Sequence, residues 1–552
     1  SATTGNELDA GSVPVTITEQ GPNSGIFGSY DETDVSNLKI TSNAARGTSA
    51  TLDYNETPVS VVVGFSTATV DIAPTDAEWN SGEEIPVTLV DGDANKNSRA
   101  DEDLDLNNPD VSLIPSLKTG DPFTIGETMN LPNATQVLYA NVTINGAVSN
   151  IGQVGGAIDN STKGFTGQLN RTLITEVTTA VSIDSFSERA LANATNAIAA
   201  RANAIVIDLE TTMADLRATI KDPRTSAGVT TRLHGTNFLN LDLRSFNDTG
   251  TFDVYLLNAT TSIIEGTAVV NEVGNMLIAE DVDPKSFTSL NSTGPLVSGL
   301  FDTTKAPDTR KIGLLLIHNS ATDVADATNW VALGDAVDPI VVDFFSFGFT
   351  DDGAESSERI SNQIVRLELE ETGDNTSTFA GSLEYTMVNQ LNILNNATYS
   401  GLSPIDDEAT FIVIEDLTDE DAPRVNYFDR GSDGVNTQVA DQEAAPSHSG
   451  VASFNSASYK IADTVIVTLE DLDLNVDSDL IEIYTTVSLP TTDDAYDTIG
   501  TVRLPTFSWG SLGNLLEVTF DDQRWKTPIA SACLTSLTSQ SITDTGLSAT
   551  GF

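Results

Sequence analysis

Two short motifs recur along this chain, and repeated motifs predict a row of similar domains. The first has an acidic residue, a glycine two residues later and a phenylalanine six residues after the glycine. It occurs in VTITEQGPNSGIF, LELEETGDNTSTF and SITDTGLSATGF, where the acidic residue is Glu19, Glu371 and Asp544. The third copy reaches its phenylalanine at Phe552, the last residue of the sequence. We therefore expect the chain to be a piece of a longer protein.

The second motif joins Phe-x-x-Ala, a strand-like VTL and an acidic Asp-x-Asp-x-Asn turn. It lies at 65–97 and at 454–479, and its acidic turns begin at Asp91 and Asp471. The segments between turns are short and rich in Val, Ile and Thr, and Gly, Asn and Asp separate them, which is typical of β-strands. Asp471 precedes the third copy of the first motif by 73 residues. That spacing suits one β-sandwich domain of about 100 residues.

The order of the motifs predicts a mainly β protein of tandem immunoglobulin-like β-sandwich domains with a large insert containing one long helix. The first acidic turn, at Asp91, is much further from its hairpin at Glu371 than the second turn, at Asp471, is from its hairpin at Asp544. This difference in spacing predicts the insert. The first expected domain, 1–60, is the closing part of a sandwich, and the second, 61–114 plus 336–445, is an interrupted sandwich. The insert is 115–335, and the last domain, 446–552, is a sandwich truncated at its C-terminus. The alternative is chance similarity between Gly- and Thr-rich turns.

The long helix is expected at about 185–222, inside the insert. This segment is rich in alanine, which has the highest helix propensity. Ser185 precedes Glu188 with the spacing of a capping box, and Pro223 is a stop signal.

The chain is strongly acidic, with 80 acidic and 26 basic residues and a formal net charge of −54. Such a charge repels nucleic acids and anionic membrane surfaces and attracts cations. Because 39% of the residues are hydrophobic, the chain can bury cores, and the acidity belongs to a folded surface. An acidic cytosolic enzyme of a halophile is the alternative reading of this composition.

Eleven Asn-x-Ser/Thr sequons, eight of them between 133 and 291, favour a secreted, glycosylated protein. The candidate glycosylation sites are Asn55, Asn133, Asn141, Asn160, Asn170, Asn193, Asn247, Asn258, Asn291, Asn375 and Asn396. Cys533 is the single cysteine and cannot form an internal disulfide. No hydrophobic run approaches the ~20 residues of a membrane span, so we expect only indirect membrane contact, through an anchor outside this chain. SATTGN at the start is compatible with removal of a signal peptide.

The acidic turns predict binding of Ca²⁺ or another divalent cation, because alternate carboxylates on a turn converge on a hard cation. DGDANKNSRADE (91–102) nearly matches an EF-hand loop, but Lys96 replaces the glycine of its sharp turn and no helix pair flanks it. We therefore expect cation-binding turns on a β scaffold. The candidate ligands are Asp91, Asp93, Asn95, Glu102, Asp103, Asp105, Asn107, Asp110, Asp471, Asp473, Asn475, Asp477 and Asp479. A solvated acidic turn without an ion is the alternative.

Motifs for catalysis are lacking in the sequence. The three histidines, His234, His318 and His448, are isolated, and there is no zinc-protease motif, nucleophile elbow, phosphate loop or cysteine pair. Paired carboxylates for glycoside hydrolysis are not excluded, since some pair will be close among 80 acidic residues. We expect a protein that is not an enzyme.

Three segments, VTLEDLDLNVDSD, the hairpin at 371–376 and DLTDEDAPRV, resemble the recurring segments of S-layer proteins of ammonia-oxidising archaea of the Nitrosopumilus type. The resemblance covers 1–110 and 340–552. It implies a secreted, N-glycosylated, largely immunoglobulin-like protein that assembles with copies of itself into a two-dimensional, hexameric lattice on the cell surface, with bound divalent ions. Lys96 and the long insert depart from the family pattern.

The sequence thus predicts a structural S-layer subunit that is supported by calcium. Its anionic surface is expected to enrich cations such as ammonium in narrow pores. The alternatives are a secreted polysaccharide- or peptide-degrading enzyme with β-sandwich domains, and a surface adhesin.

Overall fold

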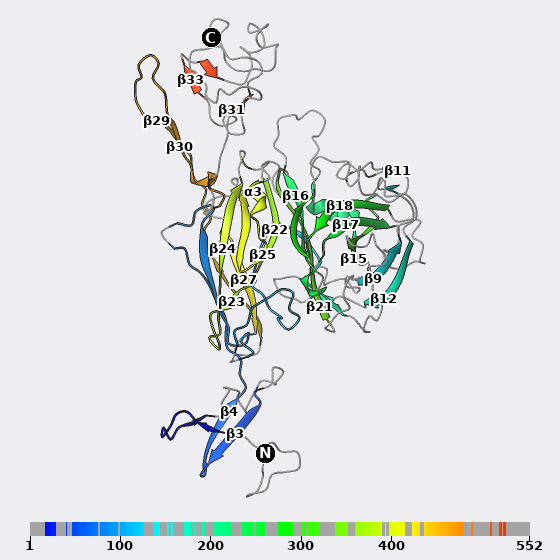
Figure 1. The fold of residues 1–552 in the computed structure, drawn as a ribbon, viewed down its shortest axis with the longest axis vertical. Coiled ribbons are helices and arrows are strands. Elements are labelled where there is room, and N and C mark those ends of the chain that lie inside the picture. The colour runs from blue at the N-terminus through cyan, green and yellow to red at the C-terminus, as the bar shows by residue number, and fades with distance from the viewer. Residues whose placement is uncertain are drawn as a thin grey trace. The chain divides into compact units, whose positions relative to one another are not determined.

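The computed structural model shows a mainly β protein built of several open, mostly antiparallel sheets, which confirms the predicted fold class at this level (Figure 1). The helices of the described residues are short, namely α1 (Met213–Thr219), α3 (Ala397–Ser400), η2 (Arg244–Phe246) and η4 (Leu472–Leu474). The structure describes residues 17–28, 40, 47–75, 78–97, 100–125, 136–143, 152–153, 156–157, 170–177, 181–182, 189–193, 204–221, 235–246, 250–259, 274–290, 301, 303, 307–318, 337–350, 359–388, 392, 397–414, 422–430, 435–477, 481, 487–488, 508–509, 518–520 and 523–525.

The chain divides into two compact units, Ser1–Thr67 with Arg430–Thr437 and Ala68–Asp429 with Gln438–Phe552. The first unit contains two antiparallel pairs, β1 (Thr18–Glu19) with β2 (Phe27–Gly28) and β3 (Ser49–Tyr54) with β4 (Thr57–Val62).

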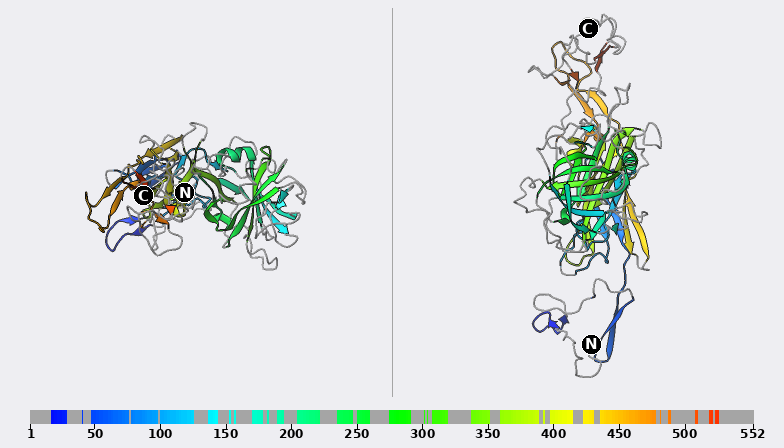
Figure 2. Two further views of the ribbon diagram at one scale, coloured as in Figure 1. Left: turned by 90° about the horizontal axis from the view of Figure 1, so that it is seen from above. Right: turned by 90° about the vertical axis from the view of Figure 1, so that its right-hand side faces the viewer.

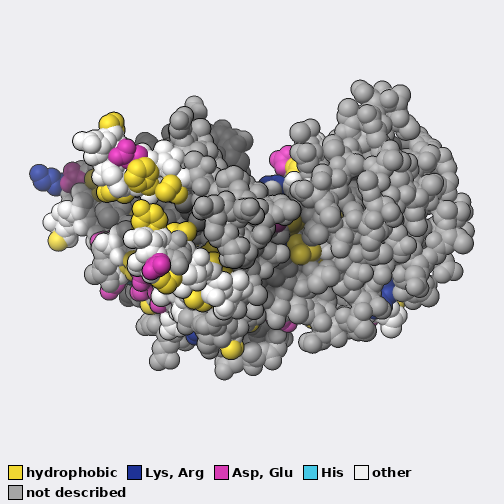
Figure 3. Space-filling model, turned by 90° about the horizontal axis from the view of Figure 1, so that it is seen from below, with side chains coloured by type: hydrophobic (Ala, Val, Ile, Leu, Met, Phe, Trp, Pro, Cys, Tyr) yellow, Lys and Arg dark blue, Asp and Glu magenta, His cyan; other side chains and the backbone are white. Residues whose placement is uncertain are grey.

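The β3–β4 hairpin exposes an apolar face. Leu52 and Val59 lie opposite each other across the two strands and are 66% and 67% exposed. Exposed hydrophobic side chains are also plain on the described surface in the space-filling view of Figure 3.

A five-stranded sheet of the second unit joins strands from both sides of the expected insert. Its order is β23-β24-β6-β5, with β26 paired to β24. These strands are β5 (Thr69–Ile72), β6 (Glu84–Val90), β23 (Glu370–Glu371), β24 (Thr378–Val388) and β26 (Glu408–Ile414). β6 and β24 are antiparallel over seven residue pairs, and β24 and β26 are parallel.

An eleven-stranded sheet runs through the second unit in the order β13-β14-β21-β22-β7-β27-β28, with β8, β16, β19 and β25 joined to it. The strands are β7 (Ser116–Thr119), β8 (Phe123–Thr124), β13 (Val181–Ser182), β14 (Ala190–Asn193), β16 (Thr236–Asp242), β19 (Lys285–Ser289), β21 (Val337–Thr350), β22 (Arg359–Leu367), β25 (Ile405–Asp406), β27 (Arg424–Arg430) and β28 (Asn436–Gln442). Because β21 pairs with both β16 and β22, the sheet continues from the expected insert into the interrupted sandwich. The domain bounds and the immunoglobulin-like topology stay predictions.

A six-stranded sheet lies wholly within the expected insert and has the order β12-β9-β15-β20-β17-β18. Figure 2 shows the cyan and green strands of this part of the chain from two further directions. Its strands are β9 (Gln136–Thr143), β12 (Asn170–Val177), β15 (Ala204–Thr212), β17 (Phe252–Ala259), β18 (Gly274–Val282) and β20 (Lys311–His318). The remaining antiparallel pairs are β10 (Gly152–Gln153) with β11 (Gly156–Ala157), β29 (Val451–Phe454) with β30 (Val467–Glu470), β31 (Val487–Ser488) with β32 (Ser508–Trp509), and β33 (Val518–Phe520) with β34 (Gln523–Trp525).

Two main hydrophobic cores follow from these sheets. One packs the five-stranded sheet against β22, β7 and β27, with Trp79, Phe379, Tyr385 and Phe411 among its buried side chains. The other packs the six-stranded sheet and α1 against β16 and β21. The five-stranded and the six-stranded sheet therefore each have their own core, and the eleven-stranded sheet contributes strands to both.

The long helix predicted at 185–222 is wrong. The described part of this segment forms β14 and β15, and only Met213–Thr219 is helical. β15 lies between β9 and β20 in the six-stranded sheet, where its Val206, Ile207 and Leu209 are buried. In β14 and β15, tertiary pairing and burial have overridden the local helix propensity.

Candidate metal centre

The hairpin motif is a carboxylate-capped turn. In the β23–β24 hairpin, Glu371 Oε1 accepts hydrogen bonds from the backbone N–H of Ser377 at 2.7 Å and from the hydroxyl of Thr376 at 3.3 Å. Asn375 and Ser377 adopt positive φ of 60° and 56°. The carboxylate thus satisfies the donors of a backbone bend that non-glycine residues rarely adopt.

The β1–β2 hairpin repeats this geometry. Glu19 Oε1 accepts from the N–H of Gly25 at 2.7 Å and from the hydroxyl of Ser24 at 3.5 Å. Asn23 and Gly25, at the positions that match Asn375 and Ser377, have φ of 65° and 66°. The first two copies of the sequence motif therefore fold into the same turn. The third copy, with Asp544, lies outside the described residues.

The first acidic turn begins where β6 ends. Asp91 is 2% exposed, its N–H donates to the carbonyl of Ser377 at 2.9 Å, and its Oδ1 accepts from the N–H of Asp93 at 2.7 Å. Its Oδ2 accepts from the hydroxyl of Tyr427 at 2.7 Å. Burial and the charge of Asp91 raise the pKa of Tyr427, so the phenol remains a donor.

Asp429 completes a group of three carboxylates with Asp91 and Asp93. One ligand atom from each lies within 4.8 Å of the others, and this is the one such group of three that the described part of the chain contains. Asp91 and Asp429 are buried, and the N–H of Ala68 donates to Asp429 Oδ2 at 3.1 Å. Three converging carboxylate oxygens suit a hard cation such as Ca²⁺, and without one their mutual repulsion is unfavourable.

Sequence reasoning missed Asp429. It lies in β27, far from the Asp-x-Asp-x-Asn turn, and no ligand spacing connects them. The available signal was strand alternation, because Val425, Tyr427 and Asp429 are the inward, buried positions of β27. An acidic residue at an inward position of a strand needs a partner or an ion.

Asn95 and Glu102, two predicted ligands, contact the hairpin. Asn95 Nδ2 donates to Glu371 Oε1 at 3.0 Å, and the N–H of Glu102 donates to Glu371 Oε2 at 3.3 Å. Burial and the nearby charge of Glu371 raise the pKa of the Glu102 carboxyl. Glu371 thereby ties the acidic turn to the hairpin.

The second acidic segment does not gather its carboxylates into a comparable group. Burial and repulsion from Asp105 raise the pKa of Asp103, and Asp103 forms a β-bridge with Glu370. The carbonyl of Asp110 accepts a hydrogen bond from Lys96 Nζ. The structure therefore places Asp103, Asp105, Asn107 and Asp110 on one loop. Among the described residues, the carboxylates of Asp103, Asp105 and Asp110 do not form a group of three within reach of one ion.

The third acidic segment repeats the first turn and then takes a different partner. Asp471 Oδ1 accepts from the N–H of Asp473 at 3.2 Å, as in the first copy. Asp473 accepts from the N–H of His448 at 2.8 Å and lies 3.1 Å from His448 Nδ1.

Asn475 docks this third segment onto the interrupted sandwich. Its Nδ2 donates to the carbonyl of Ser81 at 2.9 Å, and the Ser81 hydroxyl donates back to the carbonyl of Asn475 at 2.6 Å. The backbone of Asp477 lies beside Gly82, close to this contact, whereas Asp479 lies outside the described residues.

The sequons differ in exposure. Asn55 and Asn375 are exposed in turns, whereas Asn258 is buried within β17 at 2% exposure, which disfavours its glycosylation in the folded protein. Asn141, Asn170 and Asn193 lie in β9, β12 and β14. Outside the described residues are Asn133, Asn160, Asn247, Asn291 and Asn396.

Among the residues that the structure describes, no helix is long and apolar enough to span a membrane. The sequence matches no protein-family model and has no significant match among curated proteins.

Proposed function

We propose that this chain is a structural subunit of a cell-surface layer, built from β-sandwich modules and supported by bound divalent cations. The observation that carries the proposal is modular repetition at atomic detail. The hairpin at Glu371 recurs at Glu19 with matching hydrogen bonds and positive φ angles, and the turn at Asp91 recurs at Asp471. Repeated modules with matching turn geometry suit a structural protein that covers a surface with copies of itself.

The cation is assigned to the group of Asp91, Asp93 and Asp429. A cation there would join the turn after β6 to β27, and so link the two sheets of the interrupted sandwich. Calcium fits because it accepts several carboxylate oxygens in flexible geometry. At a net charge of −54, a lattice of such subunits would also concentrate counter-ions, ammonium among them, inside narrow pores.

Electron microscopy of the purified protein with calcium and with chelator tests this function. We expect regular two-dimensional sheets with calcium and poorly ordered or dispersed particles after chelation. Dispersed particles under both conditions would favour a secreted enzyme or an adhesin.

A further inference from the structure

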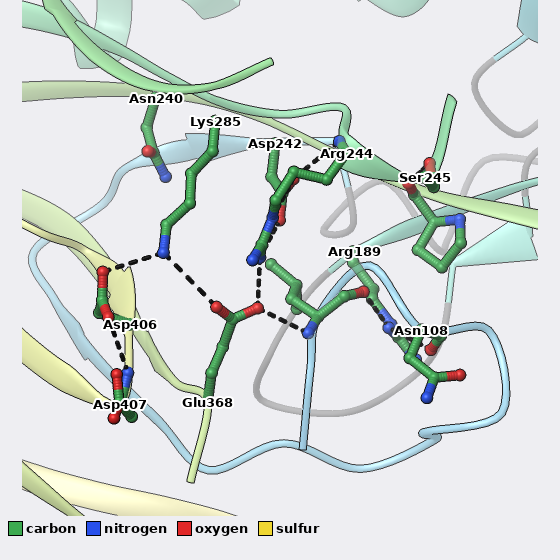
Figure 4. Close-up of polar contacts among 12 residues, drawn as sticks. Asn108, Arg189, Asn240, Asp242, Arg244, Ser245, Lys285, Glu368, Asp406 and Asp407 are labelled. Atoms are coloured by element: carbon green, nitrogen blue, oxygen red, sulfur yellow. Dashed lines mark hydrogen bonds and ion pairs between the residues drawn. The ribbon is translucent and has the colours of Figure 1, made fainter. Parts of the chain in front are cut away.

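The loop Asp103–Val111 wraps around the side chain of Arg189, which is fully buried. Arg189 Nη1 donates to the carbonyls of Leu106 and Asn108, the latter at 3.1 Å, and Nη2 donates to the carbonyl of Val111. Figure 4 shows this side chain beside Asn108. Three backbone carbonyls of one short loop thus converge on one guanidinium.

Two further side chains, one cation and one carboxylate, contact the same loop. Lys96 Nζ donates to the carbonyl of Asp110. Glu368 Oε1 accepts from the N–H of Leu106 at 2.7 Å and also from Arg244 Nη2 (Figure 4). Leu106 is therefore held through both its N–H, by Glu368, and its carbonyl, by Arg189.

The guanidinium remains charged in this setting. Burial lowers the pKa of Arg189 to about 10, against the opposing effect of the nearby Asp242 carboxylate. A buried cation needs compensation, and converging carbonyl oxygens provide it just as they do for metal ions bound by loops.

We propose that the loop Asp103–Val111 is a cation-binding loop whose ligand is a guanidinium supplied by the protein itself, Arg189. Arg189 immediately precedes β14 in the expected insert, and the loop belongs to the interrupted sandwich. This contact therefore joins the insert to the interrupted sandwich without an external ion. The backbone carbonyls of this acidic loop thus bind cations that the protein itself supplies, Arg189 and Lys96. The inference is independent of the proposed lattice function.

Chemical rescue of Arg189→Ala tests the proposal. The variant leaves the three carbonyls without their donor, and we expect its folding equilibrium, measured by urea unfolding in chelator, to fall by on the order of a hundredfold. About 10 mM guanidinium, well below the molar range in which it denatures, should restore most of the loss, whereas equal sodium chloride should not. Arg424→Ala is the matched control, because Arg424 is an exposed arginine at the start of β27. It should lose little stability and gain nothing from guanidinium.

If Arg189→Ala does not fold, the yield of refolded protein with and without guanidinium decides the question. A rise in yield with guanidinium supports the proposal. The proposal is overturned if the variant is as stable as Arg424→Ala, if guanidinium changes neither stability nor yield, or if calcium rescues it and guanidinium does not.

Discussion

Single carboxylates in this protein have different roles that follow from their neighbours. Asp91 and Asp471 occupy the same position of a repeated turn and cap it through the same backbone bond. Asp91 then faces a tyrosine hydroxyl and Asp429, whereas the turn of Asp471 continues to His448 through Asp473. The sequence predicts the turn, because turn formation is local. It cannot predict the third carboxylate, because that residue arrives from a distant strand.

Glu102 makes the stability of the hairpin region depend on pH. Because burial and Glu371 raise its pKa, the folded state holds this proton more tightly than the unfolded chain does. The stabilisation is present below the ordinary carboxyl pKa and is lost as pH rises through the raised pKa. Glu102→Gln removes the charge, so in chelator we expect it to be more stable than wild type at about pH 7 and equal to it at about pH 4. Urea unfolding at both pH values measures this, and lower stability of the variant at neutral pH would contradict it.

At the scale of elements, the sequence predicted the hairpins and acidic turns and failed on the long segment at 185–222. Hairpins are specified locally, by glycine, asparagine and a capping acid, so their motifs transfer directly to structure. The alanine-rich segment carries only a weak intrinsic preference for helix, so its secondary structure depends on the strands it pairs with. β15 pairs with β9 and β20, and β14 pairs with β21. Those pairings are not visible in the segment itself.

Gly82 controls the docking of the third acidic segment. It adopts φ of 69°, and a Cβ there would lie 2.6 Å from Asn475 Nδ2 and 2.9 Å from the backbone nitrogen of Asp477. Ala462, the residue that matches Gly82 in the second copy of the motif, adopts a φ of 71°, so this chain accepts the same backbone conformation at an alanine.

We expect Gly82→Ala to destabilise the protein by roughly 1–3 kcal/mol and to raise hydrogen exchange in 471–477. Gly401→Ala, where a Cβ meets no atom within 4 Å, is the control and should change neither quantity. Unchanged exchange in 471–477 of Gly82→Ala would show that Gly82 does not govern the docking.

At the scale of the whole molecule, modular sheets, exposed sequons and a large negative charge are the properties of the proposed surface layer. The sequence established the charge and the mainly β class, since both follow from composition and strand pattern. It could not establish that one sheet continues from the insert into the interrupted sandwich, because this depends on β21 pairing on both of its edges.

Glycosylation should follow exposure. Mass spectrometry of the native protein is expected to find glycans at Asn55 and Asn375, which are exposed in turns, and none at Asn258, which is buried. A glycan at Asn258 with bare Asn55 and Asn375 would refute this pattern.

The most direct test of the account is the order of the assembled sheets as a function of free calcium, measured by electron diffraction for wild type, Asp429→Asn and Asp71→Asn. Asp71 is an exposed aspartate on β5 of the same sandwich and serves as the matched control. We predict that wild type and Asp71→Asn form ordered sheets at the same calcium concentration. Asp429→Asn should need about tenfold more calcium, because one charged ligand is lost. Sheets of Asp429→Asn that order at the wild-type concentration, or wild-type sheets that stay ordered in chelator, would contradict the account.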